Sequence, residues 1–165
     1  MLLELFLVYL PAMVGNMAPV CADRIGISKW LNKPINERVL GKNKTVRGVV
    51  VATLAGAVTG GILTVFTSNP PYDSTTSGIT FGAATGLAAI VADAVKSFFK
   101  RNKNIPSGSS WIPFDQIDFA IGASIMSLFF IRLSFSSIII AIIFIGCASY
   151  ITSFIGVVTG VKRSL

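Results

Sequence analysis

Three aspartates flank one basic segment in the second half of this chain. Asp93 precedes the segment, and Asp115 and Asp118 follow it. The 165-residue chain has only seven acidic residues, so three of them around one cluster of Lys and Arg need a physical cause. The flanking sequence is strongly apolar, and carboxylates at the edge of apolar helices usually hold a cation or a proton relay. We therefore expect the chemistry at Asp93, Asp115 and Asp118.

The spacing after Asp93 predicts one charged helix face. If its helix continues, Asp93, Lys96 and Lys100 share a face, because side chains three or four residues apart lie side by side. Ser97 and Arg101 fit the same spacing. This face would carry a carboxylate, a hydroxyl group and several cations.

Asp115 and Asp118 are three residues apart just after Pro113, so at the start of a helix they project side by side. They have a simpler interpretation as helix caps, with Asp115 as the N-cap and Asp118 favoured by the helix dipole. Capping does not explain Asp93, which comes late in its helix, where the dipole disfavours an anion. A shared Mg²⁺ would explain all three, since magnesium binds carboxylates together with substrate phosphates and water.

A second basic segment reads RVLGKNKTVRG over residues 38–48. Lys44, Thr45 and Arg47 stand where a helix is predicted to begin, and free N–H groups beside cations suit a phosphate. The segment is not a Walker A loop, because Asn43 replaces the required glycine and a preceding strand is implausible. A basic loop is also expected from membrane topology alone.

The elements that position these residues are predicted to be membrane-spanning helices. The chain is 53% hydrophobic and 13% charged, with a mean hydropathy of +0.75, which indicates a single all-α integral-membrane domain over residues 1–165. A spanning helix needs about 20 apolar residues. Five segments approach that length: Leu2 to Cys21, Gly48 to Thr67, Ile79 to Val95, Ile117 to Leu133 and Ser137 to Val158.

The basic residues predict an orientation. Most of them lie in two connections, 22–47 and 96–114, and five spans put both connections and the carboxyl terminus on one side of the membrane. The positive-inside rule makes that side the cytoplasm and leaves the amino terminus outside. We thus expect a multi-pass protein of the cell membrane with two functional cytoplasmic loops. The net charge of +7 fits anionic lipid headgroups or a polyanionic substrate.

Residues inside the apolar segments give further expectations. Pro11, Asn16 and Pro19 in the first segment indicate a kinked helix that lines a polar cavity. Glycines recur at four-residue spacing and favour close helix packing, within one chain or across a homodimer; the pairs are Gly56 with Gly60, Gly82 with Gly86, and Gly156 with Gly160. Cys21 and Cys147 are predicted to be buried reduced thiols.

The chain has no histidine, which excludes His-based acid–base catalysis, Ser-His-Asp triads and His-ligated zinc. Metal-type carboxylates, phosphate-type cations and a membrane location instead suggest phosphoryl or nucleotidyl transfer to a lipid. Such catalysis consists mostly of positioning and charge neutralisation.

These motifs resemble the archaeal CDP-archaeol synthases, integral-membrane cytidylyltransferases related to bacterial CDP-diacylglycerol synthases. The resemblance spans most of the chain. It is carried by Pro11-Ala12 with Asn16 and Ala18-Pro19, by Leu40-Gly41 through Lys44-Thr45-Val46-Arg47-Gly48, and above all by Asp93-x-x-Lys96-Ser97-Phe98-Phe99-Lys100-Arg101 with Phe114-Asp115-Gln116-Ile117-Asp118-Phe119. The chain departs from the family pattern at four positions: Asn36, Lys42, Asn43 and Val46.

The resemblance implies that CTP and a prenyl-ether glycerol phosphate, 2,3-di-O-geranylgeranylglyceryl phosphate, give a CDP-lipid and pyrophosphate with Mg²⁺ as cofactor. It implies that Asp93, Asp115 and Asp118 hold Mg²⁺. The implied roles of the other residues are phosphate neutralisation by Lys44, Arg47, Lys96, Lys100 and Arg101, hydrogen bonds from Thr45 and Ser97, and orientation of a polar group by Asn16.

The same features leave other functions open. A CTP-dependent prenol or polyprenol kinase would be similarly small and basic and would release CDP. A cation transporter would use the aspartates as an ion site, and a passive scaffold would only associate through its glycines. We expect the membrane, CTP and the lipid as partners, and no nucleic acid.

Overall fold

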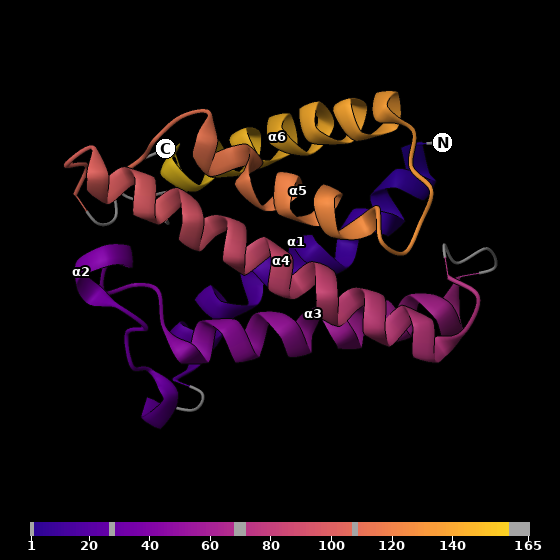
Figure 1. The fold of residues 1–165 in the computed structure, drawn as a ribbon, viewed down its shortest axis with the longest axis horizontal. Coiled ribbons are helices and arrows are strands. Elements are labelled where there is room, and N and C mark those ends of the chain that lie inside the picture. The colour runs from indigo at the N-terminus through magenta and orange to yellow at the C-terminus, as the bar shows by residue number, and fades with distance from the viewer. Residues whose placement is uncertain (1, 27–28, 68–71, 107–108, 159–165) are drawn as a thin grey trace.

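A computed structural model describes residues 2–26, 29–67, 72–106 and 109–158 of the chain (Figure 1). Its described part is helical, and its one β-type pairing is an isolated antiparallel bridge between Pro34 and Thr45. The long helices are α1 (Leu2–Ile25), α3 (Val46–Phe66), α4 (Thr75–Asn102), α5 (Phe114–Ser127) and α6 (Phe135–Val158), with the short η1 (Lys29–Leu31) and α2 (Glu37–Leu40) between α1 and α3. The predicted all-α class is confirmed.

The predicted number of five spanning helices is not confirmed. Four described helices, α1, α3, α4 and α6, are long and apolar enough to cross a membrane. The fourth predicted segment, Ile117 to Leu133, forms only the 14-residue α5, which ends at Ser127. Beyond it the chain makes tight turns, in which the N–H groups of Phe129 and Phe130 bind carbonyls three residues back. Apolar sequence continues there, but apolarity does not by itself impose helical dihedral angles.

Helix α4 is longer than predicted. The apolar segment Ile79 to Val95 marks only its centre, and the helix continues through the basic residues to Asn102. Asp93, Lys96 and Lys100 therefore lie on one continuous helix, as the predicted charged face requires.

The glycines bring α3 and α4 into backbone contact. An ideal Cβ built on Gly56 would lie 2.2 Å from the carbonyl oxygen of Gly82, and one on Gly82 would lie 2.1 Å from that of Gly56. A Cβ on Gly60 would lie 2.0 Å from the carbonyl oxygen of Gly78. Only glycine permits this approach, so these residues pack within one chain. Gly160 lies outside the described residues, and a homodimer stays a prediction.

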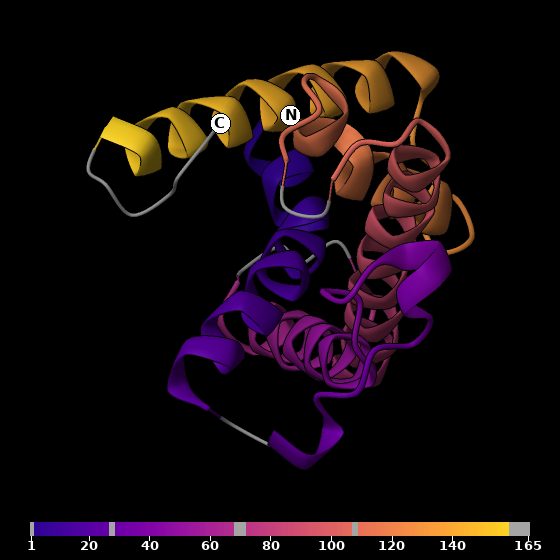
Figure 2. The same ribbon diagram turned by 90° about the vertical axis from the view of Figure 1, so that its left-hand side faces the viewer.

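Helix α1 lies in the middle of the bundle, between the α3–α4 pair and α6 (Figure 2). Pro11 and Pro19 both lie inside it, as the sequence indicates. The buried hydroxyl of Tyr9 is hydrogen-bonded to Oγ of Ser124 on α5 at 2.6 Å, which satisfies two polar groups in an apolar interior. The prediction of buried thiols is wrong, because both cysteines are exposed. Apolar sequence in a membrane protein also covers the surface that faces lipid.

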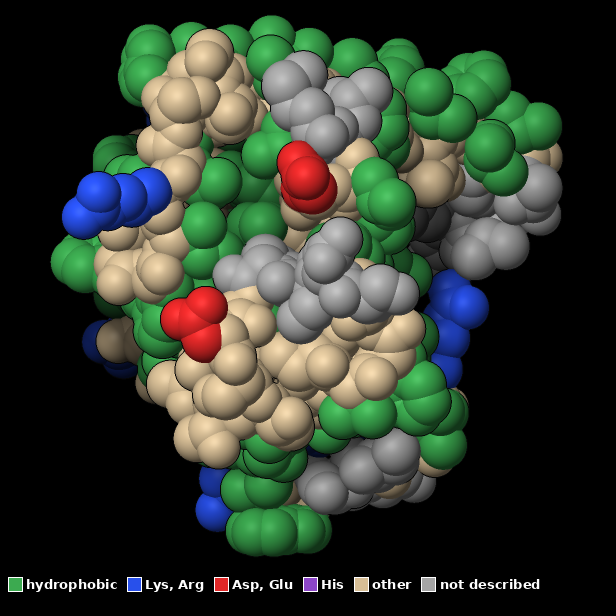
Figure 3. Space-filling model, turned by 90° about the vertical axis from the view of Figure 1, so that its right-hand side faces the viewer, with side chains coloured by type: hydrophobic (Ala, Val, Ile, Leu, Met, Phe, Trp, Pro, Cys, Tyr) green, Lys and Arg blue, Asp and Glu red, His purple; other side chains and the backbone are tan. Residues whose placement is uncertain are grey.

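The connections that carry the basic residues meet at one end of the molecule. Helix α2 and the α4–α5 connection lie at the end opposite the amino terminus (Figure 1). The face at the amino-terminal end shows mostly hydrophobic and uncharged side chains, with few charged ones (Figure 3). The charged chemistry of this protein is thus concentrated at one end of the helices.

Candidate functional site

A polar cavity of about 440 Å³ lies at the basic end of the helices. Asn16 and Pro19 of α1 form one wall, and Asp93 of α4 forms another. The segment before α3 supplies Lys44 and Thr45. The prediction that the proline-containing first helix lines a polar cavity is therefore confirmed.

Local hydrogen bonds hold the basic segment in place. The N–H of Ile35 donates to the carbonyl of Lys44 at 2.8 Å, and the N–H of Val46 donates to the carbonyl of Lys33 at 3.0 Å. Thr45 is the N-cap of α3, where its Oγ1 accepts a hydrogen bond from the N–H of Gly48 at 3.1 Å. This cap fixes where α3 begins and thereby directs the side chain of Lys44 toward α4.

The three predicted aspartates converge on one ammonium group. Nζ of Lys96 lies 3.0 Å from Oδ1 of Asp93 on the same helix. It also lies 2.7 Å from Oδ1 of Asp115 and 2.7 Å from Oδ2 of Asp118, both on α5. The sequence placed these acids near the same basic segment, and the packing of α5 on α4 brings all three to the same point. We call these three aspartates and Lys96 the aspartate–lysine cluster.

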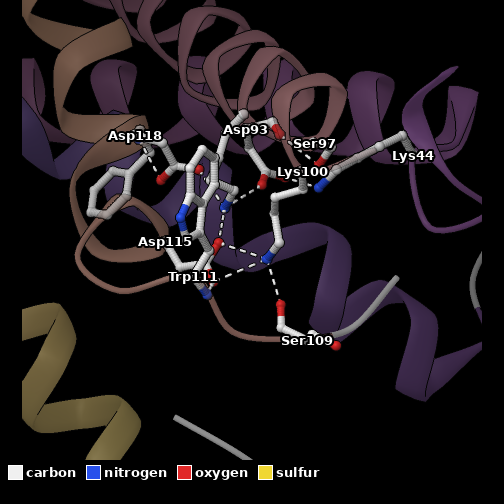
Figure 4. A network of polar contacts seen from close by, with 10 residues as sticks. Lys44, Asp93, Ser97, Lys100, Ser109, Trp111, Asp115 and Asp118 are labelled. Carbon is white, nitrogen blue, oxygen red and sulfur yellow. Dashed lines mark hydrogen bonds and ion pairs between the residues drawn. The ribbon is translucent and has the colours of Figure 1, made fainter. Parts of the chain in front are cut away.

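Two more lysines complete the arrangement (Figure 4). Nζ of Lys44 pairs with Oδ2 of Asp93 from the side of the polar cavity. Nζ of Lys100 lies 3.1 Å from both carboxylate oxygens of Asp115 and donates to the carbonyl oxygen of Ser109. Three carboxylates thus face three ammonium groups, and their formal charges cancel. Such mostly buried charges are tolerated because each has a partner of opposite sign.

Asp115 does not cap its helix. The N-cap of α5 is Pro113, and no side chain caps that helix end, so the alternative interpretation of Asp115 as the N-cap is wrong. The carboxylate instead bonds with Lys96 and Lys100 and accepts a hydrogen bond from the N–H of Trp111. Burial alone would raise the pKa of Asp115. The hydrogen bond and charge of Lys96, the N–H of Trp111 and the hydrogen bond from Lys100 outweigh that effect, and they hold the pKa of Asp115 below its usual value.

The cluster suits a divalent cation by its chemistry and by its convergence. Carboxylate oxygens are the ligands that magnesium prefers, and those of Asp93, Asp115 and Asp118 already surround one positive charge. Among the described residues, no group of three acidic or thiol side chains has metal-binding geometry as it stands. The ammonium group of Lys96 lies between the carboxylates, so a bound metal requires Lys96 to turn toward another anion.

The other predicted residues lie around the cluster and differ in the polar contacts that they make. Ser97 is buried, and its Oγ donates to the carbonyl oxygen of Asp93 at 2.8 Å. Arg47 is 4% exposed and pairs with Oδ1 of Asp23 beside the polar cavity. Arg101 is half-buried, and its Nε has no hydrogen-bond partner within the described ranges. Arg101 is thus not joined to the cluster by any contact seen there.

Two participants were missed by sequence reasoning. Asp23 pairs with Arg47 at the cavity wall. Because acidic residues are rare in this chain, its presence beside a basic segment could have indicated a role in the site. Trp111 donates its backbone N–H to Asp115, and its ring packs at a tilt against that of Phe114 with centroids 4.4 Å apart. Nothing in the spacing of the sequence points to that backbone contact, since it depends on how the α4–α5 connection folds back.

Fold and site together define a multi-pass helical membrane protein with a charged site at one end of its helix bundle. A family model described as CarS-like, CDP-archaeol synthase, matches residues 1–164. A CDP-archaeol synthase of Methanospirillum hungatei is 32% identical over 131 residues, which cover 74% of this chain and 72% of that protein. One of Saccharolobus islandicus is 32% identical over 126 residues, covering 76% and 72%.

A solved structure gives the same fold. It is described as an intramembrane enzyme for archaeal membrane lipid biosynthesis, and it matches 92% of this chain and 94% of its own with a TM-score of 0.77 at 24% identity. The chain belongs to the CDP-archaeol synthase family of archaeal lipid biosynthesis. The family resemblance predicted from the sequence motifs is confirmed.

Proposed function

We propose that this chain transfers CMP from CTP to 2,3-di-O-geranylgeranylglyceryl phosphate, giving CDP-archaeol and pyrophosphate. The observation that carries the proposal is the polar cavity that ends at the aspartate–lysine cluster, with Lys44 and Asp93 on its wall. A cation-lined cavity beside converging carboxylates suits a metal-bound triphosphate.

The charges of the cluster support a metal requirement. Because the three carboxylates of the cluster are balanced by the ammonium groups of Lys96 and of its neighbours Lys44 and Lys100, the site has no excess positive charge for a triphosphate. Asp93, Asp115 and Asp118 would hold Mg²⁺, which when bound neutralises phosphate charge and aligns the α-phosphate. Lys96, released from the carboxylates, would then pair with phosphate oxygens.

The chain's own residues bind and orient the two substrates. Lys44 and Arg47 lie on the cavity wall, where they would neutralise the β- and γ-phosphates, and the Thr45 hydroxyl would donate to a phosphate oxygen. Lys100 and Ser97 fix Asp115 and the backbone at Asp93, and Arg101 and Asn16 would contact the polar groups of the substrates from either side.

In this reaction an oxygen of the lipid phosphate forms a bond to the α-phosphorus of CTP, and the bond from that phosphorus to the bridging oxygen of the β-phosphate breaks. Pyrophosphate leaves with the electron pair of that bond. The attacking oxygen is already anionic, so no strong general base is needed, in keeping with a chain that has no histidine.

We also propose that the protein lies in the cell membrane with its site at the cytoplasmic face and its amino terminus outside. The basic connections support this orientation, because the positive-inside rule places short Lys- and Arg-rich loops in the cytoplasm. The soluble substrate CTP would reach the site from that side.

The proposal is tested with purified protein in detergent, CTP, Mg²⁺ and digeranylgeranylglyceryl phosphate. We expect equal amounts of pyrophosphate and CDP-lipid, both abolished by EDTA and restored by added Mg²⁺. Asp93→Asn should nearly abolish turnover, whereas Asp73→Asn, at an exposed position at the other end of the molecule, should not. CDP release with a prenol acceptor would identify a kinase, and full metal-dependent activity of Asp93→Asn would refute its role as a ligand.

A further inference from the structure

One cation on the wall of the polar cavity lies outside the balanced charges described above. The charged residues that line this cavity in the described part of the chain are Asp23, Lys42, Lys44, Arg47 and Asp93. Lys44 pairs with Asp93, and Arg47 pairs with Asp23. The side chain of Lys42 is exposed and makes no ion pair or hydrogen bond with any described residue. Lys42 therefore carries the uncompensated positive charge of this wall.

The backbone around Lys42 is held in a defined turn between α2 and α3. Lys42 and Asn43 form the tip of this turn. The N–H of Lys44 closes it by donating to the carbonyl oxygen of Gly41 at 3.3 Å. Gly41 has a φ of 86°, which glycine adopts without the strain that a Cβ would cause. Helix α2 packs against α4, so the tip of the turn keeps its position relative to Asp93.

The absence of a partner distinguishes Lys42 from the other cations near the site. An anion that binds Lys44 or Arg47 must compete with the carboxylate to which that cation is already bonded. Lys96 and Lys100 are bonded to carboxylates in the same way. An anion that binds Lys42 breaks no existing ion pair, so its full attraction to the ammonium group contributes to binding.

The sequence pattern gives Lys42 no role in advance. It is one of the four positions at which the chain departs from the family pattern, so no function for this residue comes from the family. The bland explanation of an exposed lysine here is the positive-inside rule, which favours basic cytoplasmic connections. That rule explains a positive charge somewhere in the connection, but it does not explain an unpaired one on the wall of the polar cavity.

We propose that Lys42 binds the terminal phosphate of the nucleotide and supplies the uncompensated charge that holds the triphosphate in the polar cavity. The proposal rests on the proposed function, which places a nucleoside triphosphate in this cavity with its α-phosphate at the aspartate–lysine cluster. The terminal phosphate carries more negative charge than the other two, because it has an additional free oxygen. It is therefore the group that gains most from an unpaired ammonium group.

Equilibrium binding of CTP, CDP and CMP tests the contact without requiring turnover. The purified protein is titrated in detergent with Mg²⁺ and without the lipid. Lys42→Met should weaken CTP binding about three- to five-fold, the size of a solvent-exposed ion pair. It should weaken CDP binding less and leave CMP binding unchanged. This order would locate the contact on the terminal phosphate and exclude the base and the ribose.

Lys33→Met is the matched control. Lys33 is an exposed lysine of the same connection and does not line the polar cavity, so this variant removes the same charge and should keep the wild-type affinity for CTP. Lys42→Arg retains the charge and should also keep it, which guards against a local change of the turn. The difference between Lys42→Met and the wild-type chain should disappear at about 1 M salt, where the Debye length is about 3 Å.

Three results would overturn the role of Lys42. The first is equal affinity of Lys42→Met and the wild-type chain for CTP. The second is an equal loss of affinity for CMP and CTP, which would show that Lys42 does not contact the terminal phosphate. The third is weaker binding of digeranylgeranylglyceryl phosphate with unchanged binding of CTP, which would place Lys42 beside the lipid phosphate.

The two proposals fail in different ways. CDP-lipid formation with the same CTP affinity in Lys42→Met and the wild-type chain would support the cytidylyltransferase and refute the role of Lys42. A loss of affinity in Lys42→Met that increases from CMP to CTP, in a protein that forms no CDP-lipid, would support the phosphate contact and refute the cytidylyltransferase.

Discussion

Replacing Gly60 by alanine should destabilise the protein, whereas the same change at the next residue should not. The new Cβ at Gly60 would lie 2.0 Å from the carbonyl oxygen of Gly78, which belongs to the rigid backbone of α4. Because side chains do not approach closer than about 3.0 Å, the two helices must separate by about 1 Å at this point. Overpacking of this kind costs about 1–3 kcal/mol.

Gly61→Ala is the matched control. Its Cβ would meet only the side chain of Ile79, with Cγ1 at 3.0 Å and Cδ1 at 3.6 Å, and that side chain can rotate away. Both substitutions gain the same helix propensity, about 1 kcal/mol in water, so the difference between them isolates the contact between α3 and α4.

The measurement is the half-life of the folded protein in detergent at a fixed elevated temperature, since unfolding of membrane proteins is often irreversible and a rate is then the meaningful quantity. We expect Gly60→Ala to unfold clearly faster than the wild-type chain and Gly61→Ala to match or outlast it. Equal half-lives for the two variants would refute the backbone contact on which the packing of α3 and α4 rests.

Two further predictions concern the cluster. Lys96→Met leaves three carboxylates with only Lys44 and Lys100 as partners. It should lower the stability of the folded protein by about 3–5 kcal/mol, the usual loss when one partner of a buried ion pair is removed. Thermal unfolding in detergent compares it with Lys33→Met, at an exposed position, and equal stability of the two variants would contradict the prediction. The lowered pKa of Asp115 adds stability that is present above the pKa of the unfolded chain, about 4, and is lost as the pH falls through the folded value. Asp115→Asn should therefore flatten the fall in stability below about pH 4, and an unchanged acid slope would show that other groups cause it.

The charged face of α4 was predictable because it depends on local periodicity. Asp93, Lys96 and Lys100 recur at helical spacing in the sequence, and any continuous helix places them together. The approach of Asp115 and Asp118 to Lys96 was suggested only by their rarity and the shared basic neighbourhood. Its geometry depends on the packing of α5 on α4, where Gly122 permits backbone contact, and no spacing along the chain encodes that contact.

The wrong predictions have a common physical origin. The simpler interpretation of Asp115 had it bind its own helix terminus, but two ammonium groups from α4 offer a stronger partner than backbone N–H groups. Cys21 and Cys147 were expected to be buried because their neighbours are apolar, yet they lie on exposed surface. In both cases a local pattern was outweighed by surroundings that the local sequence does not specify, namely a neighbouring helix or the lipid phase.

The shortness of α5 has a consequence for the membrane around it. Fourteen residues rise about 21 Å, against a hydrocarbon core of about 30 Å. The turns directly after Ser127 keep the N–H groups of Phe129, Phe130 and Ile131 bonded within the chain, which suits an apolar phase. The exposed Arg132 places the end of that segment at the membrane surface. The mismatch is accommodated most simply if the bilayer is thinner beside α5, which would bring lipid headgroups down to the depth of Lys96. Bilayer thickness would then act as a regulator of the enzyme, with turnover falling as the protein is reconstituted into lipids of increasing chain length.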